Sequence, residues 1–202
     1  MLLARPLLVA AVVAAAALGG WAALRLSAHD STPPSSRERE RGPVAVVDVA
    51  AALGAMAASG GDLWIDDRAS ARLLRVDGGS GRVRAALPVT GRLAIGAGPG
   101  AVWALEAGGD DGIALHGPLL RVDPASGAVR ARVPLGGVIG FGVLARGRDV
   151  WIWGPRDVLR VDARTARVAQ RIRVGGAHGE LRGLALVRRR LVVATADGTL
   201  LR

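Results

Sequence analysis

The chain has 202 residues with 27 basic and 17 acidic side chains, a net charge of +10. It contains no cysteine, which excludes disulfides, thiol catalysis and cysteine-ligated zinc or iron–sulfur sites. Lysine, asparagine and tyrosine are also absent, and this bias is typical of a GC-rich bacterial genome rather than of a nucleic-acid-binding protein. With Phe141 as the single phenylalanine, we expect no nucleic-acid partner, because such surfaces combine basic residues with stacking aromatic ones.

The N-terminal part of the chain indicates an address outside the cytoplasm. Residues 7–24 carry no charge and are mostly Ala, Val and Leu, so residues 1–26 are predicted to form a signal peptide or a signal-anchor helix. Leu26 occupies the −3 position of the nearest cleavage site, which favours an uncleaved transmembrane helix with the membrane as partner. Residues 27–42 contain Ser-Thr-Pro-Pro-Ser-Ser and Arg-Glu-Arg-Glu-Arg and are predicted to be a polar linker. We therefore expect an extracytoplasmic domain, membrane-anchored or secreted.

The rest of the chain repeats one motif at intervals of roughly 40 residues. The motif Leu/Val-Leu-Arg-Val-Asp occurs at residues 73–77, 119–123 and 158–162, and its first three positions recur at 200–202. Each full copy follows a segment with a tryptophan and precedes a turn and a segment of alternating apolar residues. Short β-branched segments bounded by Gly, Pro and Asp predict strands. Four strands in about 40 residues predict an all-β fold, a β-propeller of four-stranded antiparallel blades with three full repeats and a partial fourth.

The number of blades is left open by the sequence. In one alternative, residues 44–49 (VAVVDV) pair as a fourth strand with the C-terminal repeat and close a small four-bladed ring, which removes exposed sheet edges. The other alternative, which we favour, is an incomplete propeller with further blades beyond Arg202, because the last repeat stops within a strand. In both alternatives the propeller domain is expected at residues 43–202.

The turns after the three motif copies share an aspartate, and two of them share a glycine. An Asp side chain accepts hydrogen bonds from turn N–H groups, and Gly supplies a positive φ. We therefore predict roles in turns rather than in metal binding for five residues: Asp77, Asp123, Asp162, Gly81 and Gly127. Ala166 replaces the glycine of the third turn and is expected to cost strain there.

The combined pattern G-x-x-V-W…L-x-R-V-D-P-x-[ST]-G-x-V resembles that of the extracytoplasmic YVTN/NHL-type propellers, a group that includes virginiamycin B lyase-like proteins. The resemblance covers residues 44–202 and implies the propeller fold. In the lyase-like members, histidines in blade-entry loops act with an acid and a bound magnesium ion in an elimination reaction. His178 and Glu180 occupy such a loop here, which makes them the catalytic candidates. The corresponding loops of the first two repeats contain no histidine, so most of the set that this chemistry needs is missing.

Four further residues are candidates for binding a ligand. Three of them lie in an insertion at residues 107–117, and loops on a rigid scaffold often carry function. The fourth is a tryptophan that has no counterpart in the other repeats and lies at a strand end, where it lines or fills a pocket. The four residues are Trp153, His116, Asp110 and Asp111. The repeated tryptophans are instead predicted to pack between blades: Trp64, Trp103 and Trp151.

These observations favour a non-catalytic extracytoplasmic β-propeller that binds a protein partner or a small-molecule ligand, with no metal and no cofactor. One alternative is a lyase of the virginiamycin B type, which alone implies magnesium. The other is an assembly or structural factor of the cell envelope, which implies a protein partner. The sequence does not identify the ligand, because a propeller fold does not determine function.

Overall fold

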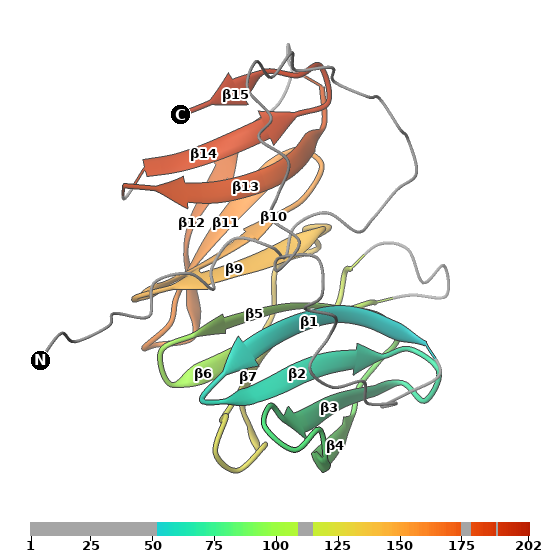
Figure 1. Ribbon diagram of the computed structural model, residues 1–202. Coiled ribbons are helices and arrows are strands. Elements are labelled where there is room, and N and C mark those ends of the chain that lie inside the picture. The colour runs from blue at the N-terminus through green and yellow to red at the C-terminus, as the bar shows by residue number, and fades with distance from the viewer. Residues whose placement is uncertain (1–51, 109–114, 175–178, 189) are drawn as a thin grey trace, which may run out of the picture. The chain divides into compact units, whose positions relative to one another are not determined.

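The structure is a computed structural model that describes residues 52–108, 115–174, 179–188 and 190–202. The described residues form four antiparallel sheets, each built from consecutive strands (Figure 1). The first sheet contains β1 (Leu53–Ser59), β2 (Asp62–Asp67), β3 (Arg72–Asp77) and β4 (Val83–Pro88). The second contains β5 (Leu93–Gly98), β6 (Ala101–Glu106), β7 (Leu119–Val122) and β8 (Val129–Val133). The third contains β9 (Gly142–Arg146), β10 (Asp149–Trp153), β11 (Asp157–Asp162) and β12 (Arg167–Arg173). The fourth contains β13 (Leu181–Val187), β14 (Arg190–Thr195) and β15 (Leu200–Leu201).

The prediction of an all-β fold made of antiparallel blades is confirmed. Three sheets have four strands and the C-terminal one has three, as the partial fourth repeat implies. The predicted signal or anchor helix at residues 1–26, the linker at 27–42 and the predicted strand at 44–49 lie outside the described residues. Within the described part of the chain, no helix is long and apolar enough to span a membrane.

The burial of the strands follows their place in each sheet. The second strand β6 is buried along its whole length, and β7 is buried at Leu119, Leu120 and Val122. A strand that is apolar on both faces needs a neighbouring layer on each side, so these strands lie inside a stack of sheets. The fourth strand β12 is exposed at six of its seven positions and carries Arg and Gln, as expected at the outer edge of a blade.

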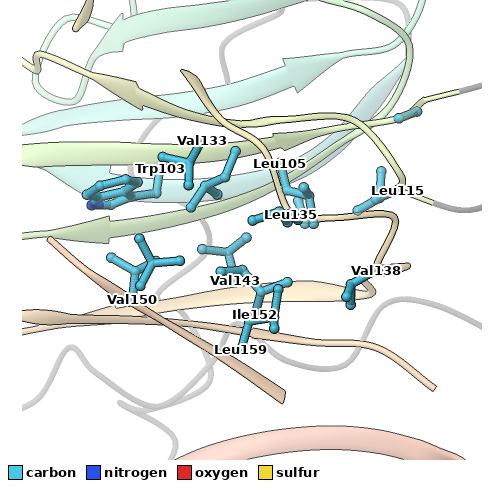
Figure 2. Close-up of a cluster of buried hydrophobic side chains, with 14 of the residues drawn as sticks. Trp103, Leu105, Leu115, Val133, Leu135, Val138, Val143, Val150, Ile152 and Leu159 are labelled. Carbon is cyan, nitrogen blue, oxygen red and sulfur yellow. The ribbon is translucent and has the colours of Figure 1, made fainter. Parts of the chain in front are cut away.

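Successive sheets pack face to face through three separate hydrophobic clusters. The first strands are neighbours, since β5 contacts both β1 and β9, and β9 contacts β13. Figure 2 shows the cluster between the second and third sheets, where Trp103 and Leu105 meet Val143, Val150 and Ile152. These three clusters hold successive sheets together, while a fourth, smaller cluster of Ile65, Leu74 and Val76 lies within the first sheet.

The repeated tryptophans occupy these interfaces. Trp64 packs with second-sheet residues such as Val102, Trp103 with the third sheet, and Trp151 with Leu181 of the fourth. All three side chains are buried. The prediction that they pack between blades therefore matches the structure at each position.

The first strands approach each other closely because of their small residues. A Cβ atom at Gly96 of β5 would lie 2.9 Å from the main-chain oxygen of Val143 in β9. Such a contact is too short for a side chain, so this position requires glycine. The alanine- and glycine-rich first strands thereby allow the blades to converge at this edge.

Candidate functional site

The antiparallel order places two kinds of connection at opposite ends of every sheet. The turns after the first and third strands lie at one end, because the register puts Asp62 of β2 opposite Asp77 of β3. We call this end the turn face. The connections after the second strand of each sheet, and those that lead into the next sheet, lie at the other end. We call that end the loop face.

The motif aspartates organise their turns at the turn face. Asp77 accepts hydrogen bonds from the N–H groups of Gly79 and Ser80 at 3.1 and 2.6 Å and from the Ser80 hydroxyl at 2.8 Å. Asp123 accepts from the N–H groups of Ala125 and Ser126 at 2.8 and 3.1 Å. Both carboxylates are therefore held by turn N–H groups, which is the arrangement expected of an Asx turn.

These hydrogen bonds lower the pKa values of the aspartates. The bonds from Ser80, together with Arg84, hold the pKa of Asp77 at about 2. The Arg130 guanidinium, bonded at 2.8 Å, and the turn N–H groups hold the pKa of Asp123 at about 2. At Asp162 the N–H and hydroxyl of Thr165 lower the pKa in the same direction. The perturbed values thus follow from turn geometry, with no catalytic role needed to explain them.

The third turn differs from the first two in its backbone. Gly81 and Gly127 have φ values of 70° and 73°, and Ala166 adopts a φ of 53° at the equivalent position. An alanine in this left-handed region is strained, because its Cβ crowds the following carbonyl. The turn keeps its shape nevertheless, since the Ala166 N–H donates to the carbonyl of Asp162 at 2.8 Å.

A shallow concavity of about 540 Å³, widely open to solvent, lies at the turn face. Turns from the first three sheets contribute to it, each at the end of a first strand, together with one residue of the β7–β8 turn. Its lining consists of Ala58, Ser59, Gly60, Ala97, Gly98, Pro99, Gly100, Pro124, Ala145, Arg146 and Gly147. These described residues include no acid and no histidine, so the wall offers main-chain groups, small apolar side chains and the Arg146 guanidinium.

The sequence candidates that the structure describes fall at the loop face instead. His116 is exposed in the β6–β7 connection, and Glu180 is exposed before β13, 3.4 Å from the Arg182 guanidinium. Trp153 is partly buried at the end of β10 and packs onto the cluster between the third and fourth sheets. Its ring also covers Gly142, where a Cβ would lie 2.2 Å from the indole. Trp153 thus fills space between two sheets.

The remaining candidates lie outside the described residues: Asp110, Asp111 and His178. In the described part of the chain, no group of three or more His, Asp or Glu side chains is arranged to hold a metal ion.

The sequence reasoning missed three buried carboxylates at the loop-face ends of β2 and β6, Asp66, Asp67 and Glu106, two of which bind a neighbouring segment of the chain. Asp66 accepts a hydrogen bond from the Leu93 N–H at 3.2 Å, and Glu106 accepts from the Thr90 N–H at 3.0 Å. Desolvation by burial raises the pKa of Asp66 despite the Leu93 bond and the nearby Arg68. The signal in the sequence was an acid within two or three residues of the repeated tryptophan. Asp66 and Glu106 fasten the segment that enters the second sheet.

A second missed feature is a link between sheets made by the motif arginine: Arg75 Nη1 donates to the carbonyl of Ala125 in the second sheet at 2.5 Å, and Arg121 Nη1 donates to the carbonyl of Arg164 in the third at 3.4 Å. The motif arginine lies over the tryptophan of its own sheet, with 5.9 Å from the Arg75 carbon Cζ to the Trp64 ring centroid and 5.8 Å for Arg121 and Trp103. Such a cation–π contact adds to the stability of the interface.

Comparisons with known proteins show the fold. No protein-family model matches the sequence, and a search of curated proteins finds no match. Among solved structures, the chain is similar to BamB from Moraxella catarrhalis, with a TM-score of 0.57 and 15% identity over 73% of this chain and 42% of that one.

Two further solved structures lead to the same conclusion. The chain is similar to Sqt1 from Saccharomyces cerevisiae, with a TM-score of 0.60 and 12% identity over 73% of this chain and 45% of that one. For the computationally designed protein Ika4 the TM-score is 0.58 at 14% identity, over 77% of this chain and 96% of that one. The chain thus spans less than half the length of BamB and of Sqt1. The neighbours support a β-propeller fold, and at these identities they carry no statement about activity.

Proposed function

We propose that the protein is a non-catalytic extracytoplasmic β-propeller whose turn face binds an extended segment of a protein partner. The observation that carries this proposal is the concavity of about 540 Å³, walled by turns from three consecutive sheets. Loops held by a rigid scaffold are where recognition is usually located. BamB and the WD40-repeat structure of RRP9 are among the similar folds, which is compatible with a scaffold that binds proteins.

The chemistry of the wall favours a peptide. At Gly60, Gly100 and Gly147 no atom lies within 4 Å of the position that a Cβ would take, so no side chain covers the main chain there. An extended peptide offers complementary main-chain groups and binds without a catalytic residue. Arg146 adds one cation; its Nη1 donates to the carbonyl of Leu186 at 3.3 Å, so its charge would attract a carboxylate of the partner at that point.

The absence of native cysteine permits a direct test by site-specific photo-crosslinking. A single cysteine at Pro99, in the concavity wall, carries a benzophenone label, and the same label at exposed Thr90 on the loop face is the matched control. We expect the full chain in its source cells to give a discrete protein adduct from P99C and none from T90C. Adducts from T90C and not from P99C would overturn the assignment of the binding face.

A further inference from the structure

The turns between the first and second strands change in charge from sheet to sheet. The first strands contact one another in the order β1, β5, β9 and β13, so these four turns follow one another along the turn face. In the first two sheets the turns read Ser-Gly-Gly-Asp (residues 59–62) and Gly-Pro-Gly-Ala (98–101). In the third and fourth they read Arg-Gly-Arg-Asp (146–149) and Val-Arg-Arg-Arg (187–190). One end of the row is therefore nearly neutral and the other is rich in arginine.

Three arginines at the charged end have no acidic partner among the described residues. Arg146, Arg148 and Arg188 are exposed, and we call them the arginine patch. Asp149 pairs with Arg146 in the strand register, yet its carboxylate lies 3.8 Å from the Arg160 guanidinium of its own sheet instead. The positive charge of the patch is therefore not balanced by a neighbouring acid.

The position of Arg146 is fixed by the neighbouring sheet. Its Nη1 atom donates to the carbonyl of Leu186 in β13 at 3.3 Å, and Leu186 directly precedes the turn that carries Arg188. A hydrogen bond to a carbonyl leaves the charge of the guanidinium and its other N–H groups available. Since Arg146 also lines the concavity, charges from two sheets lie at one edge of that site.

Arg188 has a backbone conformation that suits glycine. Its φ is 47°, and the equivalent turn positions in the first and third sheets are Gly60 and Gly147, with φ values of 61° and 63°. A residue with a Cβ atom is strained in this region. The Arg188 side chain forms no hydrogen bond or ion pair with any described residue that would offset the strain. Strain retained at an exposed position is a mark of functional sites, so the conformation adds to the evidence from charge.

The patch fits an anionic partner, and its surroundings favour a peptide over a nucleic acid. Surfaces that bind single-stranded nucleic acid combine basic residues with stacking aromatic ones. The four turns contain no aromatic residue. Beside the patch, the concavity offers the uncovered main chain of its glycines, which suits an extended peptide.

We propose, on the basis of the peptide-binding function proposed above, that the turn face recognises an acidic protein segment. Asp or Glu side chains of that segment pair with the arginine patch, because guanidinium and carboxylate groups form charge-assisted hydrogen bonds. The neutral part of the same segment lies along the glycine-rich turns of the first two sheets. The arginine patch thus sets both the chemistry of the partner and the end of the concavity where its acids bind.

The probe is a dye-labelled peptide of four Ser-Glu repeats, with four Ser-Gln repeats as its neutral control. Each peptide is titrated against the full 202-residue chain in detergent, with fluorescence anisotropy as the readout. We expect saturable binding of the acidic peptide only, and an affinity that falls with added salt because exposed charges are screened. Equal binding of both peptides, no binding of the acidic one, or tighter binding of an oligothymidylate of matched charge would overturn the proposal.

Substitutions locate the binding on the patch. Arg148→Gln and Arg188→Gly should each weaken the acidic peptide about fivefold, the loss expected for an exposed ion pair. Arg82→Gln removes an exposed arginine of the first sheet and should leave the affinity unchanged. Arg188→Gly should also raise the thermal midpoint, since glycine relieves the strained φ, so its loss of affinity cannot come from misfolding. Unchanged affinity in both patch variants, or an equal loss in Arg82→Gln, would contradict the assignment.

Crosslinking in the source cells identifies the natural segment. A single labelled cysteine at exposed Val187, beside Arg188, should attach to the same partner as P99C, at a peptide with several Asp or Glu residues. Mass spectrometry of the adduct reads that sequence. A crosslinked peptide without acids would overturn the acidic partner while the P99C adduct, and with it the peptide-binding function, still stands. No adduct from P99C would instead remove the proposed function itself, so the two failures are distinguishable.

Discussion

Arg121 covers the indole ring of Trp103 at 5.8 Å and extends its guanidinium to the carbonyl of Arg164 in the next sheet. The tryptophan side chain itself packs against the third sheet. One pair of side chains therefore contributes both the apolar and the polar part of an inter-blade contact. This explains why tryptophan and arginine recur together in the repeat.

Replacing Trp103 with alanine should strongly destabilise the second interface. The side chain is buried, and removing a buried tryptophan costs about 3–5 kcal/mol through lost transfer energy and the cavity that remains. Urea unfolding followed by circular dichroism measures the loss. Val168→Ala, on the exposed β12, is the matched control and should change the free energy of unfolding by less than about 0.5 kcal/mol. Equal losses in both variants would contradict the role given to the tryptophan.

We expect the turn aspartates to make the folded chain less stable in acid. The pKa of Asp123 is about 2 in the folded chain, below its ordinary value of 3.8. A depressed pKa stabilises the folded state above the unfolded pKa, and this contribution disappears as the pH falls from about 4 to 2. Asp123→Asn should therefore lower the free energy of unfolding at pH 7. The difference in this free energy between the variant and wild type should shrink as the pH approaches 2. Urea midpoints at several pH values test this, with Glu180→Gln on the exposed loop face as control. A difference that stays constant with pH would refute the linkage.

Asp66 should give the opposite dependence of folding stability on pH. Burial raises its pKa, so the folded state favours the protonated acid, and that stabilisation is lost as the pH rises through the raised pKa. Asp66→Asn keeps an acceptor for the Leu93 N–H and removes the buried charge. We expect the variant to gain stability relative to wild type at pH 8 and to lose this advantage near pH 4. Chemical unfolding of the variant and of wild type at the two pH values measures the effect. A stability difference, variant minus wild type, that is smaller at pH 8 than at pH 4 would contradict it.

Ala166→Gly should stabilise the third turn. The backbone there has a φ of 53°, which glycine adopts without the Cβ conflict, and the gain is about 1 kcal/mol. Thermal unfolding should show a midpoint raised by about 2–4 °C. Gly127→Ala makes the reverse change in the second turn, where φ is 73°, and should lower the midpoint. A lower midpoint for both variants would show that φ strain is not the controlling factor.

The repeat made most of the fold predictable. A tryptophan, an arginine and an aspartate at fixed spacing located the second and third strands and the turns, because each residue type suits one structural position. The buried acids Asp66 and Glu106 were not predictable in the same way. Their burial depends on contacts with main-chain N–H groups of Leu93 and Thr90, which the register of neighbouring sheets determines.

The candidate site was predicted less well than the fold. Sequence reasoning selected polar residues in connections, such as His116, because side-chain chemistry is visible in a sequence. The turn-face concavity is lined largely by glycine and alanine, whose main-chain groups become a surface only when three sheets stand side by side. Such a site has no side-chain signature.

Hydrogen–deuterium exchange with the crosslinked partner bound tests the assignment of the turn face most directly. We predict slower exchange of the amides at residues 59–62, 98–101 and 146–149, because the partner covers main-chain groups that the glycines leave open. The loop-face connection at residues 89–92 should exchange at the same rate with and without partner. Protection of that connection with no change at the three turns would contradict the account.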